Sequence, residues 1–272
     1  MNILEKIVAR KRSEIEEAKS RKTISQLEKE VLFARNKISL ASKIRDTSSP
    51  AIISEFKRKS PYKGIINGEV TPQLVTADYV KAGAAGLSVL TDTDFFGGSF
   101  DDFLLARNAN PSVPMLRKDF MVDEYQLFEA KAIGADVILL IAACLQPDEI
   151  RFLSKRAHEL GMEVLLEVHD QDELSASLGE NIDMVGVNNR NLKTFETSIE
   201  TSLALSSLIP DSFVKISESG LKDAETIWQL YQAGYKGFLI GETFMKTANP
   251  GTALADLQTQ ITQHGNLNPL VL

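Results

Sequence analysis

The run MEVLLEVH at residues 162–169 decides the fold, because the chain repeats its pattern eight times. The run is apolar over nearly its whole length and carries the charged Glu167 near its end, and it follows the amphipathic segment QPDEIRFLSKRAHELG at 146–161. Nearly continuous apolar runs are typical of parallel strands covered by helices on the sheet face. This part of the chain therefore predicts a helix followed by a buried parallel strand.

Eight such runs alternate with helical patterns from residue 50 onward. The runs are AIISEF (51–56), GLSVLTD (86–92), VPMLRKDF (113–120), DVILLIA (136–142), MEVLLEVH (162–169), DMVGVNN (183–189), FVKISES (213–219) and GFLIGE (237–242). Successive runs are about 26 residues apart, the spacing of one strand and one helix in a (β/α)8 barrel. Neither GxGxxG nor GxxxxGK[ST] occurs, so no nucleotide-binding motif favours an open sheet. We expect an α/β fold, a (β/α)8 TIM barrel.

The first 47 residues precede this alternation and have a helical pattern of their own. Ile3, Leu4, Ile7, Val8 and Ile15 lie on one helical stripe, and a second short apolar segment follows at 27–32. We expect one domain over residues 1–272, with residues 1–47 as an N-terminal helical extension. The extension holds twelve Lys/Arg and seven Asp/Glu in a chain of net charge −7. It is either a charged helix packed on an acidic body or an electropositive cover that attracts an anionic substrate.

Composition excludes several classes of protein. The acidic net charge does not favour a nucleic-acid binder, and no apolar run approaches the ~20 residues that span a bilayer. The single cysteine, Cys144, excludes an intramolecular disulfide framework. The N-terminus lacks the apolar core of a signal peptide, so we expect a cytoplasmic protein without nucleic-acid or membrane partners.

Charged and polar residues recur where the predicted strands end. They are Glu55 and Lys57 after the first strand, Lys118 after the third, Glu167 after the fifth, Asn188 and Arg190 after the sixth, and Glu218 and Ser219 after the seventh. In such barrels the carboxyl ends of the strands form the active-site face. Converging charges there form either an ion-pair network that closes the barrel or a catalytic site, and we expect the catalytic site.

These residue types suit acid–base chemistry. A lysine beside carboxylates remains an ammonium and can act as a general acid, while a partly desolvated glutamate can act as a base. A Schiff-base lysine is a competing use of the same residue. The three histidines have no metal-ligand spacing, so we expect no metal.

Two further features indicate what is bound. SESG (217–220) and IGETF (240–244) close the seventh and eighth strands, where glycine loops usually hold phosphate in this fold. Gly220 and Gly241 would supply backbone amides, and Lys57 and Ser60 would reach in from the first strand. Phe96 and Phe120, just past the second and third strands, either wall an aromatic substrate or belong to the core.

The ordered set of motifs resembles the indole-3-glycerol phosphate synthase family over essentially the whole chain. SEFKRKSPYKG (54–64) is similar to the E-x-K-x-x-S-P segment of the family, and LTD…FFGGSF (90–100), LRKDF (116–120), LLEVHD (165–170), VGVNNRNL (185–192), SESG and LIG (239–241) follow in family order. The resemblance implies conversion of 1-(o-carboxyphenylamino)-1-deoxyribulose 5-phosphate to indole-3-glycerol phosphate, with release of carbon dioxide and water. It implies no cofactor and a small phosphorylated substrate as a partner. An oligomer is not implied, a monomer is compatible, and a complex with other enzymes of the pathway is left open.

The resemblance also implies residue roles. Lys118 would be the general acid of ring closure, Glu167 the base or charge stabiliser, and Glu55 with Lys57 a linked acid–base pair, although the sequence leaves open which lysine serves closure and which dehydration. Asn188 and Ser219 would orient hydroxyls, Arg190 would pair with the departing carboxylate, and Phe96 and Phe120 would hold the anthranilate ring. Ser60, Gly220, Gly241 and Glu242 would hold the phosphate, with Glu218 and Leu239 also in the binding site.

Two positions depart from the family pattern. Tyr62 replaces a small polar residue, and Glu242 stands where serine is common. Because a carboxylate repels phosphate, we expect Glu242 to turn its side chain away and to offer only its backbone amide. The alternatives to the family assignment are a sugar-phosphate isomerase, a Schiff-base aldolase and a non-catalytic binding barrel. An isomerase of the neighbouring pathway step would use a Cys/Asp acid–base pair. The only cysteine here, Cys144, lies among apolar residues and is not placed for that role, which disfavours this alternative.

Overall fold

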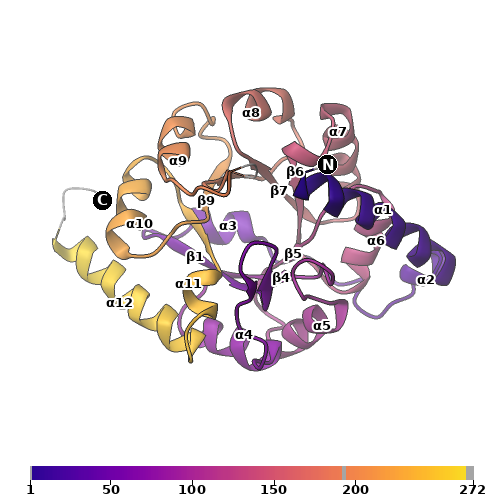
Figure 1. Cartoon of the computed structure of the whole chain (residues 1–272), viewed down its shortest axis with the longest axis horizontal. Helices are drawn as coiled ribbons and strands as arrows, with labels where there is room; N and C mark the ends of the chain where they lie inside the picture. The colour runs from indigo at the N-terminus through magenta and orange to yellow at the C-terminus, as the bar shows by residue number, and fades with distance from the viewer. Residues whose placement is uncertain (1, 192–193, 268–272) are drawn as a thin grey trace.

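The computed structural model describes residues 2–191 and 194–267, and within them eight parallel strands close a barrel (Figure 1). The strands are β1 (Ala51–Phe56), β4 (Gly86–Leu90), β5 (Met115–Lys118), β6 (Val137–Ile141), β7 (Glu163–Val168), β8 (Met184–Asn188), β9 (Val214–Glu218) and β10 (Gly237–Ile240). Each pairs with its neighbours in chain order, and β10 returns to β1. All eight predicted strands and the predicted barrel are confirmed. Residues 1, 192–193 and 268–272 of the predicted domain, including Leu192 of the VGVNNRNL motif, lie outside the described residues.

Helices alternate with the strands and form the outer ring of Figure 1. They are α4 (Pro72–Lys81), α5 (Phe100–Ala109), α6 (Tyr125–Ala132), α7 (Pro147–Glu159), α8 (Gln171–Ser177), α9 (Glu200–Leu205), α10 (Ala224–Gln232), the short α11 (Glu242–Met245) and α12 (Pro250–Leu267), with a 3-10 turn η1 (Ala142–Cys144) after β6. Several end at a glycine in the left-handed region, as at Gly134 (φ 80°) and Gly234 (φ 102°). This conformation favours glycine, which explains the glycines in IGAD (133–136) before β6 and in AGYKG (233–237) before β10.

The N-terminal extension forms α1 (Ile3–Arg21), α2 (Ile24–Leu27) and α3 (Leu40–Arg45). The predicted stripe of α1 is confirmed at Ile7 and Ile15, which are buried. Of the predicted second helical segment at 27–32, only Leu27 belongs to α2 and is buried. Val31 is 92% exposed, so the prediction was wrong beyond Leu27. Residues 28–34 form turns, which leave Val31 without a partner surface.

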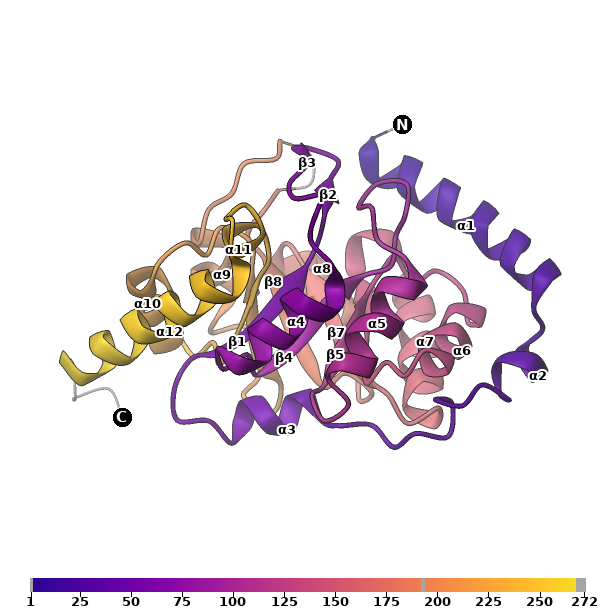
Figure 2. The same ribbon diagram turned by 90° about the horizontal axis from the view of Figure 1, so that it is seen from below.

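The barrel interior is closed at its amino end by α3, which Figure 2 shows below the strands. Leu40 and Ile44 of α3 pack with the inward-facing Ile53, Leu116 and Leu165 in one apolar cluster. A Cβ added at Gly86 would lie 2.6 Å from Leu40 Cδ1, so the absent side chain lets α3 approach the strands. This end is therefore packed shut, which leaves the opposite end for a site.

The carboxyl ends of the strands face the other way, toward the two-stranded sheet of β2 (Lys59–Ser60) and β3 (Gly64–Ile65) in Figure 2. Helix α1 lies along the same side of the molecule. No helix among the described residues is long and apolar enough to cross a membrane.

Candidate active site

A cavity of about 430 Å³ opens at the carboxyl ends of the barrel strands. A volume in this range suits a drug-sized ligand. All the predicted site residues line it: Glu55, Lys57, Ser60, Phe96, Lys118, Phe120, Glu167, Asn188, Arg190, Glu218, Ser219, Gly220, Leu239, Gly241 and Glu242. Parallel strands bring their ends to one mouth, so positions 187 residues apart in the chain meet in one cavity.

Lys118 lies at the centre of the polar wall. Its Nζ is 2.7 Å from Glu218 Oε2 and 2.9 Å from Glu167 Oε2. Glu167 also accepts a hydrogen bond from Asn188 Nδ2 at 3.0 Å through its other oxygen, and His169 Nε2 lies 3.5 Å from that oxygen. The ends of β5, β7, β8 and β9 thus join in one charged network.

The charges and the burial of this network shift the pKa values of Lys118, Glu167 and Glu218. Burial disfavours the ammonium, but the carboxylates of Glu167 and Glu218 outweigh it and raise the pKa of Lys118. Burial also disfavours the Glu167 carboxylate, yet Lys118 holds its pKa below the usual value. For Glu218, burial and the neighbouring Glu167 charge outweigh Lys118 and raise the pKa. One glutamate is therefore held ionised beside a protonated lysine, while ionisation of the other is disfavoured.

Space for Glu218 depends on Gly186, a residue that the sequence analysis missed. A Cβ added at Gly186 would lie 2.3 Å from Glu218 Oε1 and 3.2 Å from Leu165 Cδ1. A glycine inside an apolar strand is the signal that would have found it, because such glycines often mark close approach of another group. Gly186 therefore belongs to the site as the residue that makes room.

Glu55 and Lys57 form a second pair, with Lys57 Nζ 2.6 Å from Glu55 Oε1. Both come from β1 and the residue after it, two positions apart, as predicted. A Cβ at Gly241 would lie 2.5 Å from Glu55 Oε1 and 2.9 Å from its Cβ. The predicted phosphate-loop glycine thus also admits the Glu55 side chain.

Ser219 has φ 68°, in the region that non-glycine residues rarely adopt. Its carbonyl oxygen accepts a hydrogen bond from Asn189 Nδ2 at 3.1 Å, and the same nitrogen donates to Ser217 Oγ at 3.0 Å. Asn189 Oδ1 accepts from the Ser202 hydroxyl at 2.8 Å. Asn189 is 2% exposed and was not among the predicted site residues. It holds the strained turn that brings Ser219 and Gly220 into the cavity.

The predicted phosphate end lies between Ser60, Gly220 and Gly241, all in the cavity wall. The Glu242 carboxylate beside it contacts Lys63 Nζ at 2.5 Å and Arg190 Nη2 at 3.4 Å. Burial opposes its ionisation, but Lys63 and Arg190 lower the pKa of Glu242. The expectation that Glu242 offers only its backbone amide to a phosphate stays a prediction.

The other end of the cavity is apolar. The rings of Phe96 and Phe120 lie 5.9 Å apart between centroids, tilted by 38°. Ile3, Leu4 and Ile7 of α1 line the same cavity. These α1 residues were predicted only as a packing stripe, and nothing in the sequence showed that part of the stripe faces the cavity.

Cys144 lies in η1, just after β6, and is partly buried. Burial, together with the charge of Glu167, raises the pKa of the Cys144 thiol, which keeps it protonated.

Comparisons with known proteins agree with this geometry. Residues 4–257 match the family model of indole-3-glycerol phosphate synthase. The protein of that name from Bacteroides thetaiotaomicron is 49% identical over 259 residues, which cover 93% of this chain and 96% of the relative. The one from Albidiferax ferrireducens is 44% identical over 260 residues, with 94% and 98% covered.

Among solved structures, 3-hexulose-6-phosphate synthase from Salmonella typhimurium superposes with a TM-score of 0.62 at 13% identity, over 79% of this chain and 99% of that one. At this identity the likeness shows the barrel fold alone. The extent and identity of the first two matches, together with the family model, settle the family. This chain belongs to the indole-3-glycerol phosphate synthase family.

Proposed function

We propose that Lys118 is the general acid with which this carboxy-lyase closes the indole ring of its substrate, 1-(o-carboxyphenylamino)-1-deoxyribulose 5-phosphate. The observation that carries the proposal is the position of its ammonium, between Glu167 and Glu218 in the cavity. The two carboxylates raise the pKa of Lys118, so the proton is present at neutral pH when a ketone oxygen needs it.

In ring closure, the ring carbon that bears the carboxylate attacks the ketone carbon, and Lys118 gives its proton to the ketone oxygen. Positive charge then develops at the anilino nitrogen, which the ionised Glu167 stabilises. Loss of carbon dioxide returns an electron pair to the ring. The new hydroxyl then leaves as water with a proton from an acid, and a base removes the proton from the neighbouring carbon.

Lys57 and Glu55 are assigned to the dehydration step. Their contact of 2.6 Å places a proton donor and a carboxylate side by side in the cavity wall. Lys118 is assigned to closure rather than to dehydration because it lies with Phe120 on the β5 side of the cavity, where the aromatic pair is. Asn188 and Ser219 would orient the substrate hydroxyls.

Binding would use the two ends of the cavity. Phe96 and Phe120 hold the anthranilate ring at the apolar end, and Arg190 pairs with its carboxylate. At the other end Ser60 and the backbone amides around Gly220 and Gly241 hold the phosphate. Leu239 supplies apolar contact below it. The separation of an apolar end from an end with hydrogen-bond donors gives the substrate one orientation.

The proposal is tested by mixing purified protein with the substrate in the presence of a chelator and following indole fluorescence. Wild-type protein should form product, and Lys118→Ala should lower kcat by about 10³-fold, within the range of general acid catalysis. A variant that kept more than a tenth of the wild-type kcat would overturn the assignment of Lys118. Trapping by borohydride in the presence of substrate would instead favour a Schiff-base lysine.

We also propose a single-domain, monomeric, cytoplasmic enzyme with residues 1–47 as its helical extension. The cavity contacts of Ile3, Leu4 and Ile7 support the assignment of the extension to the same domain as the barrel. Sedimentation at micromolar concentration would show a species of 30.0 kDa if the enzyme is monomeric.

A further inference from the structure

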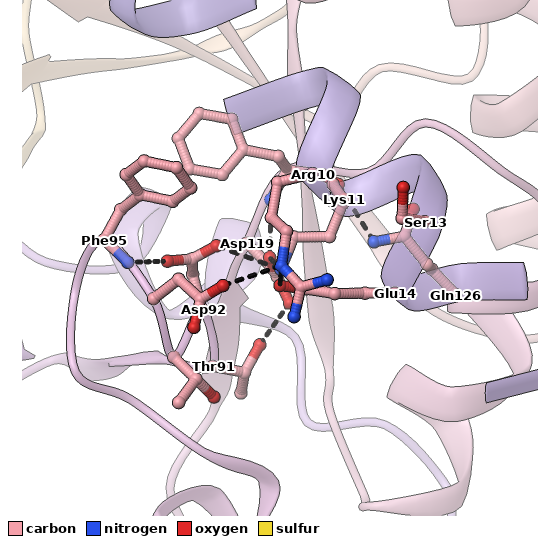
Figure 3. A network of polar contacts seen from close by, with 12 residues as sticks. Arg10, Lys11, Ser13, Glu14, Thr91, Asp92, Phe95, Asp119 and Gln126 are labelled. Carbon is pink, nitrogen blue, oxygen red and sulfur yellow. Dashed lines mark hydrogen bonds and ion pairs between the residues drawn. The ribbon is translucent and has the colours of Figure 1, made fainter. Parts of the chain in front are cut away.

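Lys11 of α1 is buried, and its ammonium contacts two carboxylates outside its own helix as well as one within it. Its Nζ lies 3.0 Å from Asp92 Oδ2, 3.0 Å from Asp119 Oδ1 and 2.7 Å from Glu14 Oε2, and the residue is 5% exposed. Figure 3 shows the side chain reaching from the helix to both aspartates. We call Lys11, Glu14, Asp92 and Asp119 the Lys11 cluster. It joins the N-terminal helix to the loops that follow β4 and β5.

Asp92 fixes the backbone of the first of these loops. Its Oδ1 accepts hydrogen bonds from the amide nitrogens of Phe95 at 2.8 Å and Phe96 at 3.2 Å. Its carbonyl oxygen accepts one from the amide of Gly98 at 2.8 Å. The loop that presents Phe96 is thus tied to the aspartate that Lys11 contacts.

Asp119 does the same for the second loop. Its Oδ1 accepts a hydrogen bond from the amide of Phe120 at 2.8 Å. Its Oδ2 accepts from the Thr91 hydroxyl at 2.6 Å and from Arg117 Nη2 at 2.9 Å. The two aspartates that hold the amides of the cavity phenylalanines therefore share one ammonium.

Charge makes this arrangement dependent on Lys11. Asp92 is 1% exposed and Asp119 is 2% exposed, so water cannot screen one carboxylate from the other. Arg117 contacts only Asp119 in this pair. Without the ammonium, the two buried carboxylates would repel each other, and relief would come from moving the loops apart.

We propose that Lys11 is a positioning residue that sets the distance between Phe96 and Phe120, and thereby holds the ring-binding end of the cavity in its productive geometry. The inference rests on the proposed function, in which these two rings hold the anthranilate ring. It predicts that loss of the Lys11 charge weakens the binding and alignment of the aromatic end of the substrate. Binding of the phosphate end should be unchanged.

The test compares Lys11→Met with Lys19→Met as a matched control. Lys19 comes from the same helix and contacts Asp123 Oδ2 in the same β5–α6 loop at 2.8 Å, but its side chain is 38% exposed. Lys11→Met should lower kcat/KM about 30-fold, since small displacements of a reacting group have large effects on rate. Lys19→Met should stay within about twofold, as expected for an exposed ion pair.

A second measurement separates positioning from general damage. Inorganic phosphate, as a competitive inhibitor, reports on the phosphate end alone, and its inhibition constant should be the same in Lys11→Met and wild type. Equal loss of phosphate inhibition and of kcat/KM would overturn the proposal. So would wild-type kinetics in Lys11→Met.

Rescue provides the third measurement and keeps the test valid if Lys11→Met folds poorly. In Lys11→Met/Asp92→Asn one carboxylate charge is gone, while the amide oxygen can still accept from the Phe95 and Phe96 amides. This double variant should recover at least several-fold in kcat/KM over Lys11→Met, and no recovery would overturn the proposal. The proposed function is tested separately. Turnover of the substrate by the wild type, together with a lower kcat/KM in Phe120→Ala, would support it whatever the result for the Lys11 variants.

Discussion

The two ends of the barrel both bury carboxylates, but they satisfy them differently. At the amino end, Asp136 is fully buried, and both of its oxygens have two donors each. Oδ1 accepts from Arg35 at 2.6 Å and from the Ile38 amide at 2.7 Å. Oδ2 accepts from Arg107 at 2.5 Å and from the Met115 amide at 2.8 Å. A buried carboxylate with this many donors stabilises the fold around it.

At the carboxyl end, Glu218 is as buried as Asp136 and much less satisfied. Its Oε2 contacts Lys118, and its Oε1 has no hydrogen-bond partner within the part of the chain that the structure describes. Burial and the charge of Glu167 raise its pKa, whereas Asp136 faces two guanidinium groups. At the amino end the hydrogen bonds of Asp136 stabilise the fold. At the carboxyl end Glu218 stays only partly hydrogen-bonded and available to a substrate, which lowers stability.

Of the three variants that test this comparison, Glu218→Gln should have the largest effect on kcat. Removing the charge takes one carboxylate from Lys118, so kcat should fall about 100-fold. Because the folded-state pKa of Glu218 is raised, its ionisation reduces stability as pH rises above the usual glutamate value, and the glutamine avoids this loss. The free energy of unfolding at pH 8, measured in urea, should therefore equal or exceed that of wild type. A much lower free energy of unfolding in Glu218→Gln would contradict the view that Glu218, unlike Asp136, does not stabilise the fold.

Asp136→Asn should show the opposite behaviour at the amino end. The asparagine leaves Arg107 without its counter-charge in a buried place, so unfolding free energy should fall by about 3–5 kcal/mol. The kcat of the folded variant should remain within about twofold of wild type, because the proposed general acid–base groups lie at the other end. Urea unfolding and steady-state kinetics on the same preparation check both statements. Loss of kcat without loss of unfolding free energy would contradict the assignment of Asp136 to stability alone.

Glu242→Gln should show the smallest effect, because this residue is at the rim. Its carboxylate engages Lys63 and Arg190, and even with the side chain turned away its charge would act on a phosphate held by the nearby amides. The variant should bind substrate more tightly, with KM lower by about threefold, a size typical of partly exposed charges. The difference should shrink at high salt, since screening weakens exposed charges. An unchanged KM at low salt would mean that the side chain contributes no charge to the phosphate end.

Much of the site could be predicted because it lies on regular elements. Lys118, Glu167 and Glu218 each end an apolar run, and a parallel barrel brings such ends together whatever the loops do. Asn189 and Lys11 could not be assigned this way. Each matters through a contact with a residue distant in sequence, and no local pattern reports such a contact. For Gly186 the local signal was a glycine inside an apolar strand, but only the structure shows that it makes room for Glu218.

The sequence by itself determined the eight-stranded barrel, the face that carries the candidate site and the polar strand-end residues that line it, because hydrophobic periodicity and strand-end position are local properties. Only the tertiary structure decided which carboxylate lacks a hydrogen-bond partner, which glycines make room for it, and that a lysine of the N-terminal helix contacts both loops that carry phenylalanines. Burial and pairing depend on distances between segments far apart in the chain, and those distances exist only after folding.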